Sequence, residues 1–154
     1  MLVGAALGYR IRNFWAIFIV AIFLHFLFDR LPHWEYHGKI DSQKIHPKEL
    51  FRLFSRALVD LAGGVFILWT FWKDSPDLAY ISFGAFISIM PDGLTFSHLL
   101  TRTLLKRENP VLKKFYWLHE KNHIQDSRNY PLWGLAAQSL VIILSIYYFI
   151  HGAS

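Results

Sequence analysis

The amino-acid sequence predicts an all-α, polytopic membrane protein with four short transmembrane helices and further amphipathic helices at the membrane interface. Hydrophobic residues make up 54% of the 154 residues and charged residues only 18%, whereas soluble domains carry about 25% charged residues. The length suits a single membrane-embedded domain, residues 1–154. Tryptophans mark the ends of the apolar runs, where an indole keeps its ring near lipid and its N–H near water.

Four apolar runs are the predicted spans: residues 14–28, 57–72, 78–91 and 132–150. A spanning helix needs about 20 residues, so the middle two runs are short. The second can gain length from the amphipathic segment 48–56, and the third lies between Pro76 and Pro91, which restrict a helix at both ends. The apolar first nine residues are too short to span, and the arginines that follow them do not suit a signal peptide.

The distribution of positive charge predicts the orientation. Thirteen of the 16 Lys and Arg residues lie between the first two runs or between the last two. Four spans place both of these segments on one side, which should be the cytoplasmic face of the inner membrane, with both termini outside. The net charge of +5 therefore indicates contact with membrane lipid, and no nucleic-acid partner is expected.

Ionisable residues gather toward the predicted cytoplasmic face. Groups at membrane depth are costly and usually face a bundle interior or a polar cavity. Since the chain has no cysteine, a metal site must use His, Asp and Glu, a set that suits zinc first, or manganese or iron. His25 with Asp29 and His119 with His123 are two pairs spaced four residues apart. Each pair lies on one helix face and can chelate one ion. The ionisable residues that gather toward this face are His25, Asp29, His33, Asp60, Asp92, His119 and His123.

Structural roles are open for each of them. His25 and Asp29 can form a hydrogen-bonded pair between helices, and Asp60 can pair with Arg56 one turn earlier. Asp92, within Pro-Asp-Gly, can be a turn or cap residue. The convergence of all of them on one face favours the metal site.

The segment His119–Glu120–Lys121–Asn122–His123 matches H-E-x-x-H. In metalloproteases this pattern places two zinc ligands on one helix face beside a glutamate that acts as general base. No glutamate follows Glu120, so a third ligand must come from another helix, such as Asp60 or Asp92. The host segment, residues 111–123, reads as a basic amphipathic helix on the membrane surface, and the His pair can also be merely interfacial.

The stretches HFLFDRLPHWEY, GAFISIMPDG and His-x-x-x-His followed by PLWGLAAQ resemble a family of small prokaryotic membrane proteins described as membrane-bound metal-dependent hydrolase-like. A more distant similarity is to α-helical zinc-dependent phospholipases C. The resemblance covers nearly the whole chain and implies these metal ligands: His25, Asp29, Asp60, Asp92, His119 and His123. Two features depart from the family pattern, because a Thr-His pair before VGAALG is absent and Glu120 is not expected.

The predicted function is a metal-dependent hydrolase at the cytoplasmic membrane face, acting on a phosphoester or lipid. Its cofactor is a divalent metal ion, which lowers the pKa of a bound water and polarises the bond under attack. Asp92 and Glu120 are the candidate catalytic residues. Two alternatives are an intramembrane metalloprotease of the H-E-x-x-H type, which depends on Glu120, and a non-catalytic scaffold or metal-binding membrane protein.

Overall fold

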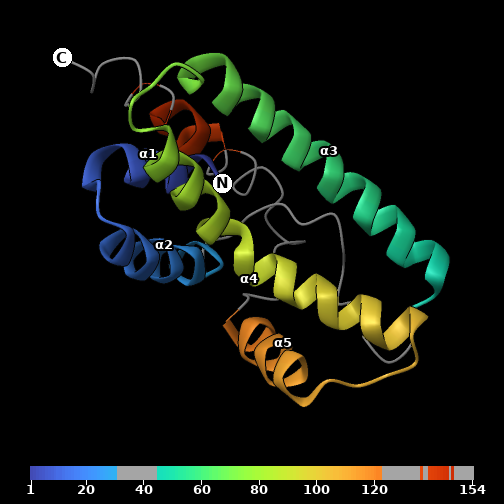
Figure 1. Ribbon diagram of the computed structural model, residues 1–154. Coiled ribbons are helices and arrows are strands. Elements are labelled where there is room, and N and C mark those ends of the chain that lie inside the picture. Colours follow the sequence, from blue (N-terminus) through green and yellow to red (C-terminus); the bar gives the residue numbers. More distant parts are fainter. Residues whose placement is uncertain (31–44, 123–135, 137–138, 146, 148–154) are drawn as a thin grey trace.

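The computed structural model describes residues 1–30, 45–122, 136, 139–145 and 147. The described part of the chain contains no strand, which confirms the all-α class. Residues 139–145 are helical. Five helices precede them (Figure 1): α1 (Leu2–Ile11), α2 (Phe14–Phe28), α3 (Pro47–Trp72), α4 (Leu78–Leu104) and α5 (Pro110–Asn122).

Helix α4 is the central element, and its predicted end is wrong. The sequence predicts a helix that stops at Pro91, whereas α4 continues to Leu104. Proline removes one helical N–H and its ring crowds the carbonyl four residues earlier, here that of Ile87. Complete burial of the Pro91 ring and packing of the following turns against α5 offset this cost. Asp92 therefore lies inside a helix and not in a turn.

Three glycines bring α1 and α4 into backbone contact. A Cβ atom at Gly4 would overlap the carbonyl oxygen of Gly84, and one at Gly84 would overlap that of Gly4. At the other end of α1, a Cβ on Gly8 would overlap the carbonyl of Tyr80. Such small-residue crossings let backbones approach closely. The pairing makes α1 antiparallel to the first half of α4.

This packing fixes the position of the N-terminus within the bundle. Gly4 lies beside Ser88, so Met1 is at the end of α1 that points toward Pro91. The predicted orientation requires the N-terminus and the ionisable residues to lie on opposite faces. The observed arrangement of α1 does not support that part of the prediction.

Helices α2 and α5 contact different parts of α4. The Phe14 ring lies 4.6 Å from that of Tyr80, and His25 reaches the Ser88 carbonyl, so α2 runs parallel to the first half of α4. Beyond Pro91, the ring of His98 lies 5.0 Å from that of Tyr116, and α5 runs antiparallel to the second half. The C-terminal ends of α2 and α5 therefore meet at the middle of α4 (Figure 1).

The connection between α4 and α5 is held by charge and by a cap. Glu108 accepts a hydrogen bond from Lys113 at 2.9 Å and pairs with Arg102 at 3.5 Å. The Lys113 hydrogen bond and charge hold the pKa of the Glu108 carboxyl below its ordinary value. The Asn109 side chain accepts from the N–H of Val111, which satisfies one of the orphan donors at the start of a helix. These contacts set where α5 begins.

Helix α3 contains both the predicted second span and the amphipathic segment before it. Pro47 occupies its first turn, and the side chains of His46 and Glu49 form a reciprocal capping box. Trp72 joins a buried cluster with residues of α1 and α4, and Phe54 stacks on Phe96 at 5.2 Å. Most of the surface between these contacts is exposed.

Among the described residues, two helices, α3 and α4, are long and apolar enough to cross a membrane. The bounds of α2 coincide with the first predicted span, but its 15 residues extend only about 22 Å, less than the bilayer core of about 30 Å. The fourth predicted span, residues 132–150, lies mostly outside the described residues. Four spans therefore remain a prediction.

Candidate metal centre

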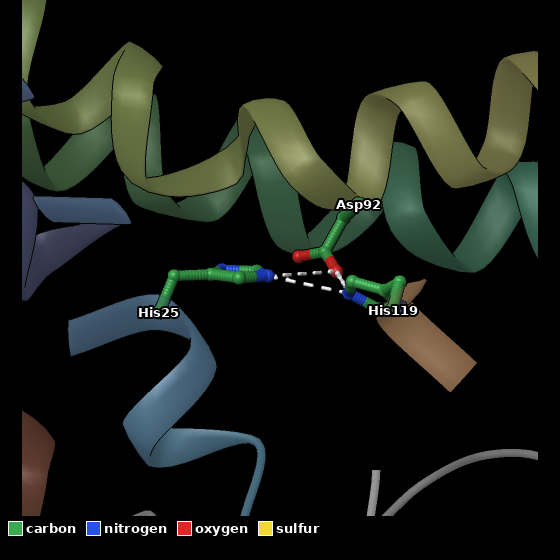
Figure 2. A group of neighbouring side chains, drawn as sticks. All are labelled: His25, Asp92 and His119. Atoms are coloured by element: carbon green, nitrogen blue, oxygen red, sulfur yellow. Dashed lines mark hydrogen bonds and ion pairs between the residues drawn. The ribbon is translucent and has the colours of Figure 1, made fainter. Parts of the chain in front are cut away.

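Four of the predicted ligand side chains meet where α2, α4 and α5 converge. His25 comes from the last turn of α2 and Asp29 directly follows that helix. Asp92 projects from α4, one residue after the buried Pro91, and His119 comes from α5. Figure 2 shows the side chains of His25, Asp92 and His119 pointing toward one another from these three helices.

The distances between the four donor atoms are those of a small coordination sphere. His25 Nε2 lies 3.3 Å from His119 Nε2, 3.3 Å from Asp29 Oδ2 and 3.7 Å from Asp92 Oδ1. His119 Nε2 lies 3.4 Å from Asp29 Oδ2 and 3.2 Å from Asp92 Oδ1. A tetrahedron with zinc–ligand bonds of about 2.0–2.1 Å has edges of about 3.3–3.4 Å. Four of its six edges are thus matched closely, and the edge between His25 and Asp92 is longer, at 3.7 Å.

A backbone hydrogen bond fixes which His25 nitrogen faces this cluster. His25 Nδ1 lies 2.9 Å from the Ser88 carbonyl oxygen. Since a carbonyl only accepts, Nδ1 carries the proton and the neutral ring presents the Nε2 lone pair to the other donors. Such an outer hydrogen bond is the usual support of a metal-ligating imidazole.

The imidazole of His119 adds a second nitrogen to this cluster. His119 Nε2 lies 3.3 Å from His25 Nε2. As an N–H it donates a hydrogen bond to the His25 lone pair, and in the other neutral tautomer both lone pairs are available to one cation. The two nearby carboxylates increase the attraction for that cation. The donor set of two imidazoles and two carboxylates suits Zn, and also Mn or Fe.

The cluster is closed on one side and open on the other. The side chains of His119, His25 and Asp29 are only 4%, 7% and 13% exposed, whereas that of Asp92 is 62% exposed. The Phe26 ring packs edge-on near both imidazoles, with centroids 5.4 and 6.1 Å away. A small molecule would therefore approach the donors past Asp92.

Not every predicted site residue joins this group. Asp60 is exposed on α3, and the His/Asp group formed by the described residues does not include it. Glu120 is partly buried on α5, next to His119 but outside the group. His33 and His123 lie outside the described residues, so the second half of the H-E-x-x-H pattern stays a prediction.

Other contacts at the site carry little or no signal in the sequence. The Ser88 carbonyl is a backbone group, and only the proline three residues later hints at an irregular hydrogen-bond ladder there. At the rim, Arg30 Nη2 donates to Asn122 Oδ1 at 3.0 Å, a contact between helix ends that are distant in sequence. His98 is fully buried against Tyr116 and helps to seat the helix that carries His119.

Comparisons with known proteins add no relative: no family model, no curated protein and no solved structure matches the chain.

Proposed function

We propose that this protein is a membrane-embedded, metal-dependent hydrolase that acts on phosphoester substrates at the membrane surface. The observation that carries the proposal is the convergence of His25, Asp29, Asp92 and His119 with tetrahedral donor spacings. Residues that are 94 positions apart in sequence supply adjacent imidazole nitrogens, which structural helix packing does not require. We call this group of four residues the His/Asp centre.

The outer surface supports a lipid environment. Large apolar side chains project from α2 and α3, among them Trp15 at 79%, Val59 at 71% and Phe66 at 70% exposure. Soluble monomers rarely expose contiguous apolar patches larger than a few hundred Å². With α3 and α4 long enough to cross a bilayer, burial of this surface in lipid accounts for it. The apolar first half of α4, residues 78–91, ends at Pro91, so lipid around that half leaves the His/Asp centre at the edge of the bilayer.

The exposure of each side chain in the His/Asp centre indicates its role in the proposed reaction. The side chains of His25, His119 and Asp29 are at most 13% exposed and would hold the ion in place, with the Ser88 carbonyl orienting His25. A bound zinc ion supplies a Lewis acid and lowers the pKa of its water to about 7. Asp92, at the open side, is placed to accept the proton of an attacking water or to complete the ligand set.

The two alternative functions, a metalloprotease and a non-catalytic metal-binding protein, differ in the role of Glu120. A metalloprotease of the H-E-x-x-H type needs Glu120 as its general base. Among the described residues, His25, Asp29 and Asp92 place donor atoms within 3.4 Å of His119 Nε2, which favours a centre that does not depend on Glu120. A non-catalytic metal-binding protein would hold the ion without turnover.

The test combines metal analysis with turnover of the detergent-purified full chain. We expect about one zinc ion per chain and hydrolysis of bis(p-nitrophenyl) phosphate, both abolished by a combined His25→Ala and His119→Ala substitution. Glu120→Gln should keep the metal and most of the phosphoesterase activity, because Glu120 lies outside the donor group. Loss of peptide hydrolysis in Glu120→Gln with metal retained would establish the protease instead. Metal binding without turnover of either substrate would leave the non-catalytic reading.

A further inference from the structure

A guanidinium group is held in place beside the His/Asp centre. Arg30 directly follows Asp29, and its Nη2 donates to the Asn122 side-chain oxygen at 3.0 Å. Asn122 in turn donates to the Leu118 carbonyl at 2.9 Å, which orients its amide. Asn122 is three residues after His119 on α5, so it lies on nearly the same helix face and within about one 5.4 Å turn of that ligand.

Arg30 has further side-chain N–H donors that no described residue takes up. Arginine has five N–H donors in a planar fork, and the contact with Asn122 uses one. Within residues 1–30, 45–122 and 139–145, no carboxylate lies within ion-pair distance of Arg30; the Asp29 carboxylate is directed at the two imidazoles. By contrast, Arg12 pairs with Asp77 at 2.7 Å and Arg102 with Glu108. Arg30 is exposed at the rim of the centre.

The net charge of the metal-loaded centre and Arg30 indicates that a ligand of these donors is an anion. Two carboxylates and two neutral imidazoles around a divalent ion sum to about zero, so Arg30 leaves the loaded centre with one net positive charge. A planar guanidinium matches the paired oxygens of a phosphate better than a point charge does.

We infer that Arg30, positioned by Asn122, forms a subsite for the phosphate oxygens of the substrate. The inference rests on the proposed function, because it assumes that the adjacent centre holds a metal ion. The phosphate can belong to a lipid headgroup or to a small soluble phosphoester, and the same oxyanion chemistry serves both.

The experiment measures inorganic phosphate binding to the zinc-loaded full chain in detergent by isothermal titration calorimetry, with zinc content determined on each sample. Arg30→Gln should weaken phosphate binding at least tenfold while zinc stays at the wild-type level. Asn122→Asp should weaken it similarly, since the new carboxylate would pair with Arg30. Arg10→Gln is the matched control, because it removes the same charge from an exposed residue at the far end of α1 and should bind phosphate normally.

The outcomes separate this subsite from the centre itself. Unchanged phosphate affinity in a zinc-loaded Arg30→Gln protein would overturn the subsite alone, and loss of zinc in that variant would show that Arg30 only braces α2 against α5. Absence of zinc from the wild-type protein would instead overturn the proposed function. Nanodiscs identify the phosphate source: loss of binding to phosphatidic acid discs in Arg30→Gln, with phosphatidylcholine discs as reference, indicates a headgroup, and unaltered disc binding indicates a soluble phosphoester.

Discussion

Replacing Asp29 with Asn is expected to abolish metal binding and any activity that depends on it. The Asp29 carboxylate lies within 3.4 Å of both imidazole Nε2 atoms, and its side chain is only 13% exposed. A buried carboxylate is costly unless a cation or hydrogen bonds compensate it. The amide has the same shape but no charge, so the fold should persist while zinc affinity falls by more than 100-fold, beyond the 10–100-fold typical of residues that only support ligands.

Thermal unfolding with and without zinc measures this prediction. Wild-type protein should gain stability with added zinc in proportion to ligand occupancy, and Asp29→Asn should lose that gain. The matched control is Asp60→Asn, which removes a carboxylate from an exposed position on α3 and should respond to zinc as the wild type does. Full zinc stoichiometry in Asp29→Asn would mean that Asp29 is a structural partner of His25. Loss of zinc in Asp60→Asn would restore Asp60 as a ligand.

A methyl group at Gly84 should destabilise the protein by about 1–3 kcal/mol, the usual range for overpacked sites. The new Cβ would overlap the Gly4 carbonyl oxygen, which is backbone and cannot rotate away, so α1 must shift from α4. Ser88, whose carbonyl orients His25, lies beside Gly4. We therefore expect weaker zinc binding as well as a lower free energy of unfolding.

Gly63→Ala, by contrast, should not lower the stability of the protein. A Cβ at Gly63 meets nothing within 4 Å, and alanine is favoured over glycine in a helix by about 0.5–1 kcal/mol. Denaturant unfolding in detergent should therefore show Gly63→Ala at or above wild-type stability. Equal effects of the two substitutions would refute the close contact of α1 with α4.

Apolar patterning was enough to predict the helices but not how they end or pair. The first predicted span and α2 share the same bounds, because a continuous apolar run is followed by charged residues. The end of α4 was missed because an internal proline usually stops a helix, and its burial depends on tertiary packing that the sequence does not display. The antiparallel packing of α1 against α4 depends on contacts of glycines that are far apart in the sequence, such as Gly4 and Gly84.

The residues of the candidate site were also only partly predictable from the sequence. The predicted position along the spans grouped Asp60 with His25, Asp29, Asp92 and His119. That position does not determine which side of a helix faces the other helices. Asp60 lies on the outer side of α3. The hydrogen bond between Arg30 and Asn122 joins two helix ends 92 residues apart and has no local pattern. The residue types that cluster in the His/Asp centre were therefore predictable, and the contacts that position them were not.

Zinc K-edge X-ray absorption on the zinc-loaded protein tests the His/Asp centre most directly. We expect four nitrogen or oxygen ligands at about 2.0–2.2 Å, with the outer-shell scattering of two imidazoles. His25→Ala should bind less zinc, and the zinc that it retains should show one imidazole. A six-coordinate sphere without imidazole scattering, or a spectrum unchanged by His25→Ala, would contradict a metal centre at this position.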